Sequence, residues 1–423
     1  MKDKNFYIKV SKKIEKNKYV QSVRDGLMIS MPLLIVGSFF LILRFLPVPG
    51  YLEFMQKIFG EKWINYIIYP IDTSFGLMAL FALLGISYRF SEEKQVEKLP
   101  SIILSVYSFI MLTPYVIFFK KESILGIKME YLGSNGIFLA IIIPFIVINI
   151  YAYFIKRNFV LKMPKSVPNI VQISFSSLIP FFVITFMLLI IRILLENSKF
   201  ENIHKVISIF LTKPLLNIGN TYIGLVFVVL TLLFFTSLGL HGTSIVMGIA
   251  SPVYNSMMDQ NRIAFQSGKF IPNILTPQFF DLFIGMGGVG NTIGLVILML
   301  FFSKSKQFKN LGKLSIIPAI FNINEPILFG VPIVMNPILV IPFFISSFVT
   351  TTTGYFLLKF NFIERLTGVV VPWTTPPIIN AYLATNGGIK MVIFQILAIF
   401  FSIIIYYPFF KKYDNIKLEE EKI

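Results

Sequence analysis

One carboxylate, Glu325, lies in a stretch that is otherwise apolar and rich in proline, FNINEPILFGVPIVMNP (321–337). It is the only charged side chain between Lys313 and Lys359. A carboxylate at bilayer depth is costly unless it faces a polar cavity or a partner, so such a residue is functional by default. Glu325 is therefore the first candidate for chemistry in this chain.

Prolines and a glycine surround this carboxylate and disfavour a continuous helix, because each proline removes a backbone donor. Broken backbone at membrane depth is tolerated only where protein buries it or where it lines a wet site. We expect residues 314–333 to form an interrupted, re-entrant hairpin that presents Glu325, Asn322 and Asn324 to a hydrophilic ligand. The alternative is a solvated loop between two helices.

A histidine provides the second candidate, in the sequence SLGLHGTSIVMGIASPVY (237–254). His241 has Gly239 and Gly242 close on either side. An imidazole can exchange hydrogen bonds with a sugar hydroxyl or pass a proton near neutral pH, and glycine lets a ligand approach the backbone. A structural histidine is the alternative.

Two further stretches combine turn-forming residues with polar side chains. In TPQFFDLFIGMGGVGNTIGLVI (276–297) four glycines precede Asn291; this is not a phosphate-binding P-loop, and close helix packing explains the glycines equally well. In VVVPWTTPPIINAYLATNGG (369–388) Trp373 precedes Thr374. The indole could cover the apolar face of a pyranose or anchor a helix at the membrane interface.

Composition restricts the class of protein. The chain has 423 residues, 55% of them hydrophobic and only 14% charged, against about 25% charged in soluble proteins. The net charge of +17 comes from lysines and arginines at the ends of apolar runs, which indicates membrane topology and not nucleic-acid binding. Cysteine is absent and only His204 and His241 could donate imidazole, so we expect no metal and no cofactor.

The elements that must position these residues are membrane helices. We predict an all-α polytopic protein with about ten crossings and two re-entrant or broken hairpins. The expected divisions are a basic cytoplasmic N-terminus (1–25), five scaffold and dimerisation helices (26–195, with spans at 26–46, 73–90, 99–119, 136–155 and 172–195), an interfacial linker helix (196–218), a transport domain (219–410) and a cytoplasmic tail (411–423).

Within the second half, apolar runs predict spans at 219–240, 283–302, 334–358 and 389–408, each near the length that a bilayer requires. Loop charges place both termini in the cytoplasm. Residues 241–275 must then supply an outward crossing, and their glycines, prolines and charges predict a second broken element there. Short broken segments of this kind indicate a transport site.

Taken together, GLHGTSIV (239–246), GMGGVGNTIGLVI (285–297), FNINEPILFGVPIVMNP (321–337) and VPWTTPPIINAYLAT (371–385) resemble the membrane component, enzyme IIC, of bacterial phosphotransferase-system permeases. The likeness is strongest to the lactose/cellobiose/diacetylchitobiose family. It extends over nearly the whole chain, and the Asn-Glu-Pro element with its proline-rich tail is its most specific part.

The resemblance implies a homodimer in the bacterial cytoplasmic membrane whose first five helices form the interface. It places Glu325 and His241 near the sugar hydroxyl that is phosphorylated. Sugar-contacting residues of the family fall at Asn324 and Trp373. The remaining candidates for substrate binding are Asn322, Thr374, Gly242 and Asn291, the last at a place where a small residue such as alanine is expected.

The resemblance also implies partners. In that family the phosphate comes from a phosphocysteine on a cytoplasmic IIB protein, supplied in turn by IIA, HPr and enzyme I. Because this chain has no cysteine, its IIB must be a separate polypeptide. The expected function is uptake of a β-linked disaccharide and phosphorylation of its 6-hydroxyl. The rivals are an ion-coupled secondary transporter, in which Glu325 is a protonation site, and a non-transporting membrane sensor or scaffold.

Overall fold

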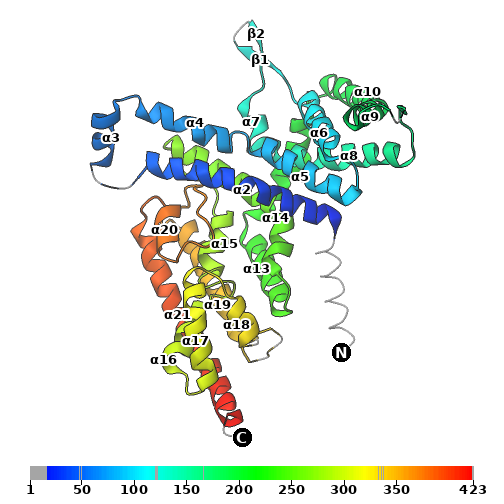
Figure 1. Cartoon of the computed structure of the whole chain (residues 1–423). Coiled ribbons are helices and arrows are strands. Elements are labelled where there is room, and N and C mark those ends of the chain that lie inside the picture. The colour runs from blue at the N-terminus through cyan, green and yellow to red at the C-terminus, as the bar shows by residue number, and fades with distance from the viewer. Residues whose placement is uncertain are drawn as a thin grey trace.

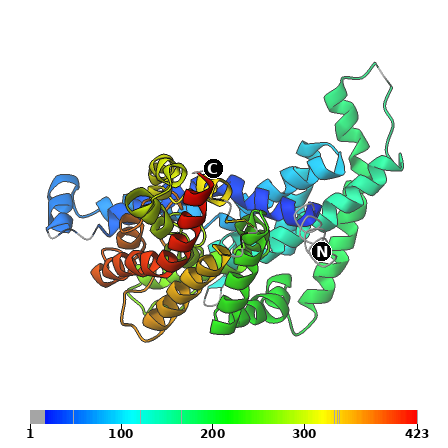
Figure 2. The same cartoon turned by 90° about the horizontal axis from the view of Figure 1, so that it is seen from below.

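The computed structural model describes residues 17–46, 48, 50–119, 122–164, 166–331, 333–334, 336 and 338–421. Helices dominate, and the chain forms two bodies, an elongated upper one from the first half and a more upright lower one from the second half (Figure 1). Seen from below, the first-half helices extend well beyond the elements near the C-terminus (Figure 2).

The first half consists of helices and one small hairpin. In chain order they are α2 (Lys18–Arg44), α3 (Tyr51–Phe59), α4 (Trp63–Phe75), α5 (Met78–Lys94), α6 (Lys98–Leu112), β1 (Val116–Phe119), β2 (Glu122–Leu125), α7 (Met129–Leu132), the short 3₁₀ helix η1 (Ser134–Gly136), α8 (Ile137–Lys156), α9 (Asn169–Ser176) and α10 (Leu178–Glu196). Helix α2 begins at the cap Asn17, whose side chain accepts from the N–H groups of Tyr19 and Val20.

The second half continues with helices of very different lengths. They are α11 (Ile203–Ile207), the π-helical turn η2 (Ser208–Thr212), α12 (Lys213–Gly219), α13 (Tyr222–Ser237), α14 (Gly242–Gln266), α15 (Pro277–Ile284), α16 (Ile293–Phe302), α17 (Lys306–Ile320), α18 (Glu325–Gly330), α19 (Val340–Lys359), α20 (Ile379–Ala384) and α21 (Ile389–Glu420). The predicted linker 196–218 corresponds to α11, η2 and α12, which meet α13 at an angle of 80°.

Among the described residues, six helices are long and apolar enough to cross a membrane, or seven if the bent pair before Ser237 is one span. They lie at Lys18–Arg44, Trp63–Lys94, Ser134–Lys156, Asn169–Glu196, Val340–Lys359 and Ile389–Glu420. The chain is thus a multi-pass membrane protein, as predicted, whereas the count of about ten crossings is not reached by these helices.

The prediction for 241–275 was wrong in one respect, because α14 is a continuous helix that passes through Pro252. Its 25 residues span about 37 Å, enough to cross a bilayer. Many of its polar residues are buried in protein, among them Asp259, Asn261 and Arg262. The glycines, prolines and charges led to the wrong prediction because protein, not lipid, surrounds this polar face.

The predicted span 283–302 is not one helix, because α15 ends at Ile284 and α16 begins only at Ile293, after a turn. Gly287, Gly288 and Gly290 all have positive φ, a conformation that glycine adopts without steric cost. Residues 285–292 therefore reverse the backbone, and the second interruption of the second half lies here.

Two smaller predictions also need correction. The span 99–119 ends at Leu112, and the antiparallel strands β1 and β2 follow, so the protein is not purely helical. Pro114, two residues after Leu112, is consistent with this stop. The tail is not separate from the last span either, because α21 continues as a helix to Glu420.

Candidate functional site

Glu325 is the first residue of the short helix α18, directly after the turn that ends α17. Pro326 occupies the first helical turn, where its missing N–H leaves no intrahelical bond unmade. The Glu325 side chain is exposed. The predicted interruption of the hairpin is present at this turn, although Pro332 and Pro337 lie outside the described residues.

Asn322 fixes the turn from inside. It has a positive φ of 62°, is only 7% exposed, and donates both amide hydrogens to the carbonyls of Trp373, at 2.7 Å, and Thr375, at 2.9 Å. Its Oδ1 accepts the Gly287 N–H at 3.1 Å. One side chain therefore joins the glycine turn, the Asn-Glu-Pro turn and the loop around Trp373.

Asn324 makes a second link between the same elements. Its amide donates to the Val289 carbonyl at 2.7 Å. A Cβ at Gly288 would lie 2.3 Å from Asn324 Cγ, which leaves no room for any other residue there. The glycines of 285–292 thus allow the turn to close around Asn324.

Asn291 and Thr292 hold the glycine turn together from the interior. Asn291 is fully buried and donates to the Phe283 carbonyl and to Thr350 Oγ1, while its Oδ1 accepts the Met286 N–H. Thr292 donates to the Gly287 carbonyl at 2.6 Å. The predicted contact of Asn291 with sugar remains a prediction, and its geometry here is that of a structural residue.

His241 caps the N-terminus of α14 with its side chain. Nδ1 accepts the Ser244 N–H and lies 2.9 Å from Ser244 Oγ. An Nδ1 that accepts leaves the proton of the neutral ring on Nε2, which can donate to a ligand. Gly242, by contrast, is buried against α13, where a Cβ would lie 2.2 Å from the Leu232 carbonyl oxygen.

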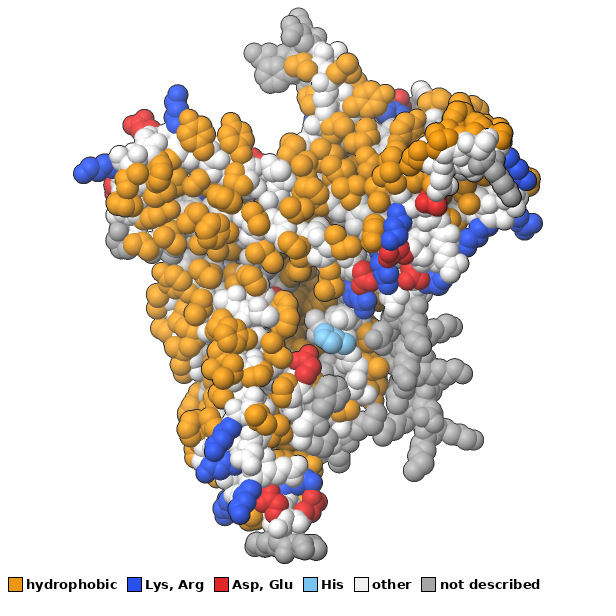
Figure 3. All heavy atoms as spheres, in the orientation of Figure 1, with side chains coloured by type: hydrophobic (Ala, Val, Ile, Leu, Met, Phe, Trp, Pro, Cys, Tyr) orange, Lys and Arg blue, Asp and Glu red, His pale blue; other side chains and the backbone are white. Residues whose placement is uncertain are grey.

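The turn before His241 contacts the segment after α18. A Cβ at Gly239 would lie 2.9 Å from Val334 Cγ1, so the backbone on the N-terminal side of His241 packs against the chain that leaves the Glu325 helix. His241 is exposed, while His204, the other histidine, is buried against Thr113. On the face shown in Figure 3, a histidine and an acidic side chain lie close together beside a hollow.

The loop around Trp373 completes the arrangement. The indole is 53% exposed and Thr374 is half-buried, while the Trp373 carbonyl is held by Asn322. The structure thus joins the elements carrying Asn322, Asn324 and Trp373 by hydrogen bonds. Glu325 and His241 belong to segments that pack against this unit, and both side chains remain available to a ligand.

One acid was missed by the sequence reasoning. Asp281 on α15 is the only charged residue between Lys269 and Lys304, and it lies one turn before Gly285. The criterion that selected Glu325, a lone carboxylate in an apolar stretch, would have selected Asp281 as well. It is half-buried.

Comparisons with known proteins cover the whole arrangement. The family model "Phosphotransferase system, EIIC" matches residues 24–347. The "Lichenan permease IIC component" of Bacillus subtilis (strain 168) is 43% identical, over 97% of this chain and 93% of that protein. The "PTS system cellobiose-specific EIIC component" of Geobacillus stearothermophilus is also 43% identical, over 98% and 94%.

A solved structure agrees over the same length. The crystal structure of the IIC component from the N,N'-diacetylchitobiose-specific phosphotransferase system superposes with a TM-score of 0.96 at 43% identity, covering 99% of this chain and 98% of that one. Sequence and fold both match from end to end, as the four motifs had indicated. The chain therefore belongs to the EIIC family of the phosphotransferase system.

Proposed function

We propose that this protein binds a β-linked disaccharide, carries it across the bacterial cytoplasmic membrane and presents its 6-hydroxyl to a phosphorylated IIB protein. The observation that carries the proposal is the exposed carboxylate of Glu325, on a turn whose neighbouring asparagines are already bonded to backbone. The two relatives at 43% identity carry cellobiose and lichenan in their names, which supports a β-linked glucose disaccharide.

In the proposed mechanism Glu325 accepts a hydrogen bond from the sugar 6-hydroxyl and orients its oxygen toward the phosphorus. His241 donates from Nε2 to the sugar. The P–S bond of the IIB phosphocysteine breaks as the P–O bond to the sugar forms, the cysteine leaves as a thiolate, and the hydroxyl proton passes to Glu325 because His241 Nε2 already carries a proton. Transfer of this kind depends on positioning and on stabilisation of charge.

Other residues support the reaction without touching the phosphoryl group. The exposed Trp373 indole stacks on an apolar face of a pyranose, and Thr374 offers a hydroxyl beside it. Asn322, Asn324 and Asn291 keep the backbone of the site in place. Phosphorylation of the sugar prevents its return, so uptake needs no ion gradient.

The test uses membrane vesicles supplied with purified phospho-IIB and radiolabelled cellobiose. Glu325→Gln keeps the size of the side chain and removes its charge, and we expect sugar phosphorylation to fall by about 100-fold or more. Glu61→Gln, at an exposed glutamate between α3 and α4, is the matched control and should retain activity. Full activity of Glu325→Gln would remove this carboxylate from the mechanism.

The rival function, an ion-coupled transporter, receives no support from the comparisons. It predicts that a protonophore abolishes uptake, whereas our proposal predicts that uptake requires phosphoenolpyruvate. A panel of cellobiose, diacetylchitobiose and lactose in the same vesicles identifies the sugar.

We further propose cytoplasmic termini and a homodimer formed by the first-half helices. Light scattering of the purified protein measures its molar mass and so tests the dimer. A mass equal to that of one chain would contradict it.

A further inference from the structure

A cavity of about 500 Å³ lies between the two halves of the protein, away from the site described above. Its walls come from α4, from α7 and η1, and from the C-terminal end of α14 and the loop that follows. Asp259 is 18 residues beyond His241, which corresponds to about 27 Å along α14. The cavity is thus distinct from the site around Glu325, and its volume is within the roughly 300–1,000 Å³ of small-molecule sites.

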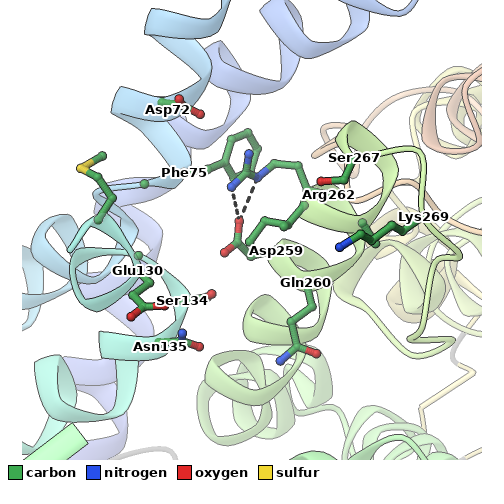
Figure 4. A pocket seen from close by; sticks show the side chains of 15 residues that line it. Asp72, Phe75, Glu130, Ser134, Asn135, Asp259, Gln260, Arg262, Ser267 and Lys269 are labelled. Atoms are coloured by element: carbon green, nitrogen blue, oxygen red, sulfur yellow. Dashed lines mark hydrogen bonds and ion pairs between the residues drawn. The ribbon is translucent and has the colours of Figure 1, made fainter. Parts of the chain in front are cut away.

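Nine of the fifteen residues that line the cavity are polar or charged. Figure 4 shows Asp72, Glu130 and Asn135 from the first half facing Gln260 and Lys269 from the second. Only 14% of the residues of this protein are charged. A concentration of hydrophilic groups in such a protein indicates a ligand more often than a packing role.

The charge balance argues against an anion. Three carboxylates, those of Asp72, Glu130 and Asp259, face two bases, Arg262 and Lys269. The arginine is already used, because its Nε and Nη2 both lie 2.8 Å from Asp259 Oδ1, Nη1 donates to Gln266, and the guanidinium covers the Phe75 ring at 4.6 Å. Glu130 also lies 3.8 Å from Lys128, so among the lining bases only Lys269 has no ion pair with a described residue, and a phosphate or phospholipid headgroup would find this single base beside the Asp72 carboxylate.

The same groups suit a neutral ligand with many hydroxyls. Asp72 and Glu130 accept hydrogen bonds, Lys269 and Asn135 donate them, and Asp259 Oδ2 receives none from the described residues. The described residues contain no group of three or more His, Asp or Glu side chains that could hold a metal ion. A sugar, whose hydroxyls both donate and accept, matches this set of groups best.

We propose that this cavity is a second sugar-binding site, which holds the disaccharide between the two halves before it reaches Glu325. This inference rests on the proposed function, because it assumes the same sugar. Both halves contribute walls, so occupancy of the cavity depends on how the two halves lie against each other.

The absence of cysteine from the chain makes a labelling test possible. Ser267→Cys places a single thiol on the exposed rim of the cavity, and Ser123→Cys places one on the exposed strand β2 as the control. Maleimide labelling rates of the purified protein are measured with and without cellobiose. We expect cellobiose to slow labelling at position 267, to leave position 123 unchanged, and to protect equally in a Glu325→Gln background.

A second variant separates occupancy of the cavity from a conformational change. Asp72→Asn removes a charged acceptor, and the sugar concentration needed for protection should rise about tenfold. Undiminished protection in Asp72→Asn, or loss of protection in Glu325→Gln, would overturn the inference. So would an unprotected Ser267→Cys protein that still phosphorylates cellobiose, a result that leaves the proposed function standing.

Discussion

The two halves of this protein hold their backbones in place by different means. In the first half, α2 and α5 touch through glycines: a Cβ at Gly26 would lie 2.5 Å from the Ile86 nitrogen, and one at Gly85 would lie 2.4 Å from the Gly26 oxygen. Buried serines such as Ser22 and Ser105 donate to carbonyls of their own helices. Small residues of this kind let helices pack closely without any break.

In the second half, asparagine side chains connect backbones that are not in regular helices. Asn220 Oδ1 accepts the N–H groups of Ile274 and Leu275. The Asn261 side chain donates to the Asn273 carbonyl and accepts the Asn273 N–H. Asn322 connects its own turn to the glycine turn at Gly287 and to the loop around Trp373. An amide suits this role because it donates and accepts at once.

The difference shows how a membrane protein can contain interrupted helices. Each break frees backbone N–H and C=O groups that lipid cannot satisfy, and buried asparagines satisfy them in this fold. The first half relies less on such asparagines because its long helices satisfy their own backbones, although Arg192 there donates to the Met111 carbonyl at the end of α6. Substitutions should therefore have different consequences in the two halves.

The largest effect is expected for Asn322→Leu. It removes three hydrogen bonds and leaves the Gly287 N–H and two carbonyls without this partner, which should cost about 3 kcal/mol or more of stability. Thermal unfolding in detergent and sugar phosphorylation should both show the loss. Asn149→Leu is the control, because Asn149 donates only to a carbonyl of its own helix α8 and to Tyr19. Equal losses in the two variants would contradict the distinction between the halves.

A smaller effect is expected for Gly26→Ala in the first half. The added methyl would meet the Ile86 backbone, so α2 and α5 must separate, and overpacking of this kind costs about 1–3 kcal/mol. Stability should fall, while the cellobiose concentration for half-maximal phosphorylation stays the same. The control is Gly248→Ala in α14, where the nearest atom would be at an ordinary 3.4 Å. If Gly26→Ala were as stable as Gly248→Ala, the close approach of α2 to α5 at Gly26 would not contribute to stability.

The smallest effect concerns pH at the end of α21. The Ser305 hydroxyl, followed by the N–H groups of Gln307 and Lys306, lowers the pKa of Glu421 below its ordinary value of 4.5. Because the folded pKa is depressed, this contribution to stability is complete above the ordinary value and disappears as the pH falls through the folded pKa. Glu421→Gln should therefore lose stability at pH 7 and show a weaker decline in acid. If the stability of Glu421→Gln fell in acid as steeply as that of the unmodified protein, this prediction would be wrong.

The sequence was sufficient to predict several long helices and one break in the backbone. Long apolar runs were sufficient for α8 and α19, and the Asn-Glu-Pro element correctly predicted a break at Glu325. An isolated charge and the spacing of prolines are local features, so both can be read from a single sequence. The family resemblance was confirmed by the comparisons over the whole chain.

Features that depend on distant contacts could not be predicted. Asn322 bonds partners 35, 51 and 53 residues away, and nothing in the local pattern identifies them. The continuity of α14 depends on the protein that covers its polar face, and hydropathy contains no information about that cover. The roles of Asn291 and Gly242 as interior residues also follow only from their neighbours in space.

The lower end of α21 has a mechanical consequence. Asp414 accepts from the Ser303 hydroxyl and from the N–H groups of Lys304 and Ser305, and Glu421 bonds the first residues of α17. Helix α17 then extends about 22 Å to the turn that precedes Glu325. A phosphoryl donor domain fused after Glu421 would be attached to the unit formed by α21 and α17. Its distance from the turn before Glu325 would therefore stay the same. A donor fused ahead of Asn17 would be attached to the other half. Under the proposed function, in which the sugar passes between the halves, its local concentration at Glu325 would depend on how the two halves lie against each other.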